Sequence, residues 1–142
     1  MRRGFSLAEL AVTIVVLCVV TAVTLPRLRG LLDWVAVDTA AREVTTALAT
    51  ARHAAVLQAS KSRLLIAGDS LRIDRWGLTG WTPFARWPGP AGHEVELEVS
   101  NPEVAFGPTG TGWGASNTSV VLRRGRHTET ITVSRVGRVK RW

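Results

Sequence analysis

The sequence predicts an α+β protein, with one long N-terminal helix followed by a domain of short antiparallel strands. Three observations lead to this fold class. An uncharged apolar run extends from Leu10 to Leu25. Beyond it, apolar residues recur every three or four positions, which is the period of one helical face. After Ser62 the pattern changes to short β-like segments separated by glycine-containing turns.

The apolar run is long enough to cross a membrane but carries one carboxylate near its start. A helix needs about 20 residues to span the hydrocarbon core, and residues 5–25 just meet this length. Placing the charged side chain of Glu9 inside a bilayer would cost about 2.5–3.5 kcal/mol, so the default hypothesis is that this residue has a function. The segment is a secretory signal peptide cut near Ala22, a plain anchor, or an anchor in which Glu9 has a partner. That partner would be a basic group or the free amino terminus of a neighbouring chain.

The helix is predicted to continue beyond the apolar run, to residue 58. Pro26 removes one backbone hydrogen bond, so we expect a bend just before it. We expect a membrane segment over 5–26 and an amphipathic continuation over 27–59 that lies on a globular domain. The apolar residues of this continuation share one face: Leu28, Leu31, Leu32, Val35, Ala40, Val44, Ala47, Leu48, Ala51 and Ala55.

Residues 60–142 are predicted to form the β-rich globular domain, with an antiparallel sheet. The expected strands cover residues 62–67, 70–74, 93–100, 104–106, 119–124, 128–134 and 135–142, the last at an edge of the sheet. Two long connections separate them. Residues 75–92 are rich in Trp, Gly and Pro and are predicted to be a loop with a short strand near Trp81. Residues 107–117 form a glycine-rich loop.

The N-terminal residues Gly4-Phe5-Ser6-Leu7-Ala8-Glu9-Leu10, preceded by two arginines, resemble the class III signal of type IV pilins and type II secretion pseudopilins. The resemblance implies that a prepilin peptidase removes the leader 1–4 by cutting after Gly4, on the cytoplasmic side. It also implies N-methylation of Phe5. Glu9 would neutralise the amino terminus of an adjacent subunit during filament assembly. Pro26 stands where these proteins usually carry a helix-kinking proline.

The second half of the chain resembles the GspH/FimT group of that family. The segments that carry this resemblance are 51–56 (ARHAAV), 106–110 (FGPTG), 131–134 (ITVS) and 137–140 (GRVK). The group comprises minor pseudopilins of type II secretion systems and minor pilins of type IV pili. The resemblance implies a ladle-shaped, non-enzymatic subunit with a single pass through the bacterial inner membrane and its C-terminal domain outside the cytoplasm. Its partners would be other pilin subunits, the prepilin peptidase and the inner-membrane assembly platform, and its destination the filament.

The residues themselves predict no catalytic, metal or cofactor site. His53, His93 and His127 are not in a metal-binding spacing such as HExxH. Cys18 is the only cysteine, so the chain has no internal disulfide and no cysteine-based metal site. The glycine-rich segment 110–114 lacks the Lys-Ser/Thr pair of a phosphate-binding loop.

The tryptophans are numerous, six in 142 residues. Trp76, Trp81 and Trp87 fall within the predicted loop 75–92. We expect core packing or a subunit contact there, with ligand stacking as the alternative.

The C-terminal segment 120–142 is strongly basic. It holds seven Arg and Lys residues against Glu129 alone, a net charge of +6 out of +7 for the whole chain. Such residues neutralise phosphates, and an aromatic side chain beside them can stack on a base. If the last residues are extended, Arg138, Lys140 and Trp142 share one face, and Arg141 lies on the other.

The family resemblance bears on this segment too. FimT-type minor pilins of competent bacteria are associated with DNA binding through a C-terminal Gly-Arg-x-Arg motif. Here residues 137–140 read Gly-Arg-Val-Lys, and the final Lys keeps the charge but loses the fork-shaped donor of Arg. An alternative function is therefore DNA uptake in natural transformation. The alternatives without DNA are protection of an edge strand and docking onto an acidic neighbouring subunit. The candidate DNA-binding residues are Arg135, Arg138, Lys140, Arg141 and Trp142.

Overall fold

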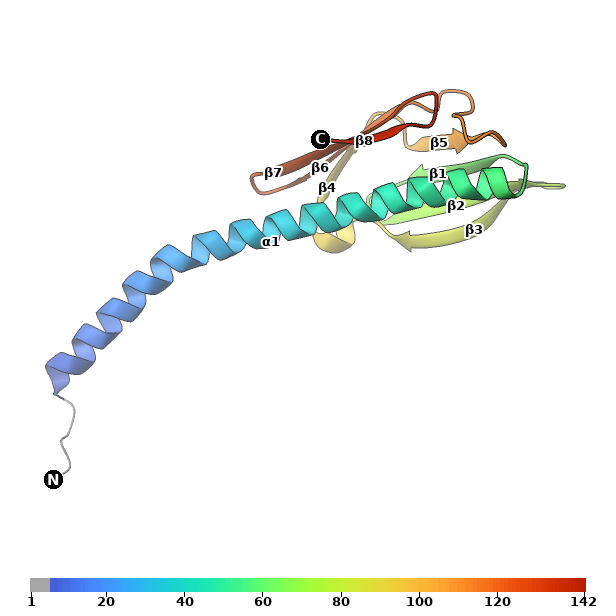
Figure 1. Ribbon diagram of the computed structural model, residues 1–142. Helices are drawn as coiled ribbons and strands as arrows, with labels where there is room; N and C mark the ends of the chain where they lie inside the picture. The colour runs from blue at the N-terminus through green and yellow to red at the C-terminus, as the bar shows by residue number, and fades with distance from the viewer. Residues whose placement is uncertain (1–5) are drawn as a thin grey trace. The chain divides into compact units, whose positions relative to one another are not determined.

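A computed structural model describes residues 6–142 of the chain (Figure 1). The predicted cleavage site between Gly4 and Phe5 lies outside the described residues. The chain divides into two compact units, the first ending at Leu32 and the second running from Asp33 to Trp142.

The N-terminal helix α1 runs from Leu7 to Leu57 and includes Pro26 without a break. Within the first unit its side chains are exposed, and only Gly30 is half-buried. An 18-residue window of α1 has a mean hydropathy of 2.4, so the helix is long and apolar enough to cross a membrane. The long predicted helix is therefore confirmed over the described residues.

One face of α1 is buried from Val37 onward, and it consists mainly of small residues. Its buried members are Val37, Ala40, Ala41, Val44, Ala47, Leu48, Ala51, Ala54 and Ala55. The predicted apolar face is confirmed from Ala40 on. Its first members, from Leu28 to Val35, are exposed instead, because helical spacing identifies a face but not the point at which other elements begin to cover it.

The strands of the second unit form two antiparallel four-stranded sheets, where a single sheet was expected. The first sheet has the order β3-β2-β1-β5 and the second the order β4-β6-β7-β8. The strands are β1 (Ser62–Ile66), β2 (Ser70–Gly77), β3 (Gly80–Pro88), β4 (Glu96–Val99), β5 (Glu103–Phe106), β6 (Thr118–Arg124), β7 (His127–Val133) and β8 (Val139–Arg141).

The strand β3 includes the short strand predicted near Trp81, but it is longer and corrects the prediction of a loop over most of residues 75–92. It pairs with β2 along its length, from Trp76 opposite Trp81 to Ser70 opposite Pro88, with a bulge after Ile73. Proline lacks an amide donor, but β3 is an edge strand, where proline is tolerated. The Trp- and Pro-rich composition therefore belongs to a sheet edge.

The strand β4 is shorter than predicted, because His93 ends a 3-10 turn, η1 (Pro90–His93), that precedes it. The residues of β4 alternate between the two faces of the sheet. Leu97 and Val99 are half-buried, whereas Glu96 and Glu98 are exposed.

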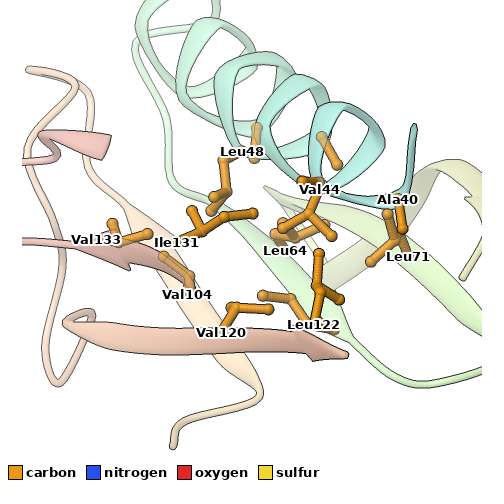
Figure 2. Packing of buried hydrophobic residues seen from close by; sticks show 14 of the residues in the cluster. Ala40, Val44, Leu48, Leu64, Leu71, Val104, Val120, Leu122, Ile131 and Val133 are labelled. Carbon is orange, nitrogen blue, oxygen red and sulfur yellow. The ribbon is translucent and has the colours of Figure 1, made fainter. Parts of the chain in front are cut away.

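A single hydrophobic core joins α1 to both sheets. Figure 2 shows Val44 and Leu48 of α1 facing Leu64 from the first sheet and Ile131 and Leu122 from the second. All five side chains are fully buried. The helix is thus the element against which both sheets pack.

Three polar contacts link acidic side chains of α1 to the second sheet or its flank. Asp33 forms an ion pair with Arg124 (3.0 Å) and Asp38 with Arg141, and His93 Nε2 lies 3.0 Å from Glu43 Oε2. The pairs add polar contacts between helix and sheet at the rim of the apolar core.

Asp38 is held in its ionised form by two arginines. Arg42 Nε donates to its Oδ2 at 2.7 Å, and Arg141 donates to its Oδ1. These hydrogen bonds, that of Arg42 first, lower the pKa of Asp38 below its ordinary value of 3.8.

Replacing Asp38 by Asn should therefore destabilise the fold in a pH-dependent way. Because the pKa is lower in the folded protein than in the unfolded chain, the contribution of the carboxylate is complete above about pH 3.8. It is lost as the pH falls through the folded-state value. We expect Asp38→Asn to have a lower melting temperature than the wild type near neutral pH, and the difference in melting temperature to vanish in strong acid. Circular dichroism of the full chain in detergent measures both temperatures.

Asp69 provides the control for this experiment, because its pair with Arg86 is exposed and 3.8 Å long. Exposed pairs contribute little to stability, so Asp69→Asn should melt with the wild type throughout. If the melting temperature of Asp38→Asn lay equally far below that of the wild type at neutral and acidic pH, the assigned role of the carboxylate would be contradicted.

Candidate functional site

The first candidate region surrounds Glu9, in the first turn of α1. Its neighbours Leu7, Leu10 and Val12 are large, apolar and exposed. No residue within 6–142 forms an ion pair with Glu9. A carboxylate on an uncovered apolar helix needs a partner once the helix enters hydrocarbon.

The polar side chains of the same segment are satisfied within the helix. The hydroxyls of Thr13, Thr21 and Thr24 each donate to the carbonyl four residues earlier, at 2.7 Å. In hydrocarbon every polar group must find such an internal partner. Glu9 stands out because its carboxylate has none among the described residues.

The second candidate region is the C-terminal edge strand β8. Its residues Val139 and Arg141 lie opposite Val133 and Ile131 of β7, which are buried, so they share the core-facing side. Lys140 points to the other side. Trp142 continues the ladder beyond β8, and its amide donates to the carbonyl of Thr130 at 2.9 Å. Lys140 and Trp142 therefore share the outer face, as the predicted alternation requires.

Lys140 and Trp142 are in direct contact on this outer face. The Lys140 ammonium lies 3.3 Å from the centroid of the Trp142 ring, a cation–π arrangement, and the indole is 67% exposed. Arg138 lies beside them. Together with Lys140 it lines a shallow hollow of about 250 Å³ over the end of β7.

Gly137 fixes the turn that presents Arg138. Its φ of +75° is left-handed, and a Cβ atom there would lie 2.5 Å from the carbonyl oxygen of Gly110. Its amide donates to the carbonyl of Ser134 at 2.9 Å. A side chain at 137 would thus displace the turn, which explains the glycine before Arg138.

Arg141 connects β8 to the rest of the domain. It forms ion pairs with Asp38 of α1 and with Glu129 of β7. Arg124 is engaged in the same way, by Asp33 and Glu94. The positive charge available on the surface is therefore smaller than the sequence sum suggests.

Arg135 is exposed and lies in the same turn region as Arg138. Its carbonyl accepts a hydrogen bond from the amide of Gly112 at 2.8 Å, which ties the β5–β6 loop to this turn. The exposed part of the candidate surface thus comprises Arg135, Arg138, Lys140 and Trp142.

A groove of about 770 Å³ lies between the second half of α1 and the turn before β8. Arg52, His53 and Arg138 are among its lining residues, and no carboxylate lines it. Arg52 Nη1 donates to the carbonyl of Gly137 at 3.4 Å, which connects the helix to the turn. Arg138 thus stands between this groove and the hollow over β7.

The histidines do not assemble into a metal site. His93 pairs with Glu43, and His53 is exposed on α1. Within residues 6–142, no three side chains of the His, Cys, Asp and Glu types are grouped so as to hold a metal ion.

Comparison with known proteins gives one family and one fold. The family model described as "Type II transport protein GspH" matches residues 40–137. The type IV minor pilin FimU of Pseudomonas aeruginosa is 18% identical, with a TM-score of 0.62 over 73% of this chain and 86% of that chain. The minor pseudopilin EpsH of the Vibrio cholerae type 2 secretion system is 11% identical, with a TM-score of 0.61 over 75% and 95%. No curated protein matches the chain. At these identities the structural likeness shows the fold alone.

Proposed function

This chain belongs to the GspH family, whose members are structural pilin and pseudopilin subunits, and we propose that it is an assembly subunit of a type II secretion pseudopilus or a type IV pilus. In this proposal the leader 1–4 is removed, and Phe5 becomes the methylated amino terminus. The first unit anchors the chain in the inner membrane, and the C-terminal domain lies outside the cytoplasm. The subunit then moves into the filament.

The observation that carries the proposal is the exposed carboxylate of Glu9 on a bare apolar helix, without a partner among residues 6–142. A carboxylate buried among apolar helices is retained only if an opposite charge compensates it. Cleavage after Gly4 creates such a charge, the amino group of Phe5, four residues before Glu9. Neighbouring subunits in a filament would therefore supply both the apolar cover for the helix and the counter-charge for Glu9.

Replacing Glu9 by Gln should block assembly without blocking insertion. The variant loses the charge but keeps the size of the side chain, and its membrane insertion should be equal or better. We expect the amount in the sheared filament fraction to fall by about tenfold or more, since about 1.4 kcal/mol of pairing energy corresponds to a factor of ten. Immunoblots of the membrane and filament fractions give both quantities.

The conservative variant Glu9→Asp keeps the charge and should retain part of the assembly. Normal incorporation of Glu9→Gln would remove the proposed role of the carboxylate. Deletion of the chain in its bacterium separates the two systems, because loss of protein secretion assigns a pseudopilus and loss of piliation assigns a pilus.

A second candidate function, DNA binding for natural transformation, is favoured by the outer face of β8. Lys140 and Trp142 are in contact there, and Arg138 lines the same hollow as Lys140. Two cations and an exposed indole in a row suit a nucleic-acid backbone with an unstacked base. Arg141 is excluded from this proposal because Asp38 and Glu129 engage it.

The double variant Arg138→Ala/Lys140→Ala should weaken retardation of DNA by the full chain in detergent. For each phosphate that the variant no longer neutralises, the slope of log affinity against log salt should become shallower by about 1. The matched control is Arg123→Ala/Arg126→Ala. It removes the same charge from an exposed site at the turn between β6 and β7. If both double variants weakened DNA retardation equally, the loss would follow from total charge alone, and the proposed surface on β8 would be rejected. Failure of the wild type to retard DNA at low salt would end the proposal.

A further inference from the structure

An exposed apolar surface lies at the end of the second unit where α1 terminates. We call it the end patch. Its residues are Leu57, Trp76, Leu78 and Trp113, which are 83%, 46%, 110% and 52% exposed. They come from three separate segments: the end of α1, the β2–β3 hairpin and the β5–β6 loop. Figure 1 shows these segments meeting at one end of the second unit.

Lys61 holds the indoles of the end patch together. Its ammonium lies 4.1 Å from the ring centroid of Trp113 and 5.8 Å from that of Trp76. Trp76 in turn meets Trp81 edge to face, with the centroids 5.2 Å apart. Ser60 Oγ donates to the carbonyl of Trp76 at 2.8 Å, which ties the hairpin to the end of the helix. The patch is therefore fixed before any partner arrives.

Leu78 occupies the tip of the β2–β3 hairpin, between Gly77 and Gly80. Turn positions of this kind usually hold Gly, Asn, Asp or Ser, which satisfy the backbone of the turn. The leucine is fully exposed, so the fold gains no apolar burial from it. Exposed apolar patches of this kind mark contacts with other molecules.

Among the described residues, one uncompensated cation, Lys61, lies at the end patch, whereas Arg63 is paired with Asp74 and with Glu103. Lys61 and Arg63 lie over the rings of Trp113 and Trp81, Arg63 at 4.5 Å from its ring centroid. The nearby Asp74 side chain is only 3% exposed and is neutralised by Arg63 and by Arg72. Lys61 forms no ion pair with any residue in the described part of the chain. An incoming partner therefore meets indoles, an aliphatic tip and an uncompensated cation.

We propose that the end patch docks onto a lipid bilayer surface that carries anionic headgroups. Indole rings prefer the headgroup level of a bilayer, and a protruding Leu78 reaches the boundary of the acyl chains. Lys61 lies beside them, where it attracts anionic phosphates. The inference is independent of the proposed assembly function, because it uses none of the residues around Glu9 or in β8.

The test uses the full chain held in phosphatidylcholine nanodiscs and separately added vesicles. Vesicles containing phosphatidylglycerol should carry the nanodiscs upward in a flotation gradient, and pure phosphatidylcholine vesicles should do so much less. Leu78→Ser should lower the captured fraction roughly tenfold, because serine has no apolar side chain to bury in the bilayer. Lys61→Gln should lower it about fivefold.

Val136→Ser is the matched control, because Val136 is 66% exposed and lies outside the end patch, in the turn before β8. Its capture should equal that of the wild type. Absence of capture, equal capture by both vesicle types, or equal effects of Val136→Ser and Leu78→Ser would each overturn the proposal.

A label at the tip gives a second measurement. In a Cys18→Ser background, Leu78→Cys carries a polarity-sensitive dye, and Thr128→Cys provides an exposed control position on the second sheet. We expect a blue shift on anionic vesicles for position 78 only. Dye that stays in water at position 78 would contradict docking through the tip.

Discussion

The close contact between the alanine-rich face of α1 and two separate sheets is the constraint on which the C-terminal domain depends. Ala40, Ala47 and Ala51 are buried with almost no exposed surface. Their small side chains let the helix backbone approach the strands, and Ser62 Oγ donates to the carbonyl of Ala51 within this contact. No strand is shared between the sheets. The helix is what gives both of them a common core.

The same helix presents the opposite situation in the first unit. From Leu7 to Leu32 its apolar side chains have no cover from the described part of the chain, although burying a residue such as Leu17 in an apolar environment is favourable by about 1.5–3 kcal/mol. In the proposed function a membrane supplies that cover first, and neighbouring helices in a filament supply it later. In the same proposal Glu9 distinguishes the two environments, because only the filament offers it a fixed opposite charge. Membrane anchoring and assembly would then both depend on one segment.

The sequence was most informative where structure is local. The period of α1 and the strands β6 and β7 depend on residues close in the chain, and these predictions are confirmed. For β3 only a short strand near Trp81 was predicted, because its Trp and Pro residues are typical of a loop, while its pairing depends on β2. The division into two sheets is likewise a matter of long-range pairing, which periodicity does not encode.

The candidate sites show the same division. Alternation correctly separated Lys140 and Trp142 from Arg141, but the partner of Arg141, Asp38, is 103 residues away and left no local signal. The end patch was also not foreseen. Its members are spread from Leu57 to Trp113, and only the fold brings them together. Two hints were usable. Trp76 lies in the segment where core packing or a subunit contact was expected, and Leu78 is an aliphatic residue flanked by Gly77 and by the Thr-Gly pair that ends the turn.

The counter-charge proposed for Glu9 is a new amino terminus at Phe5, and mass spectrometry of the mature protein, purified from membranes of its bacterium, can detect it. We expect an N-terminal peptide that begins with methylated Phe5 and lacks residues 1–4. A mature chain that begins at Val23 would mean an ordinary signal peptide, without the anchor and without Glu9, and would exclude this pairing.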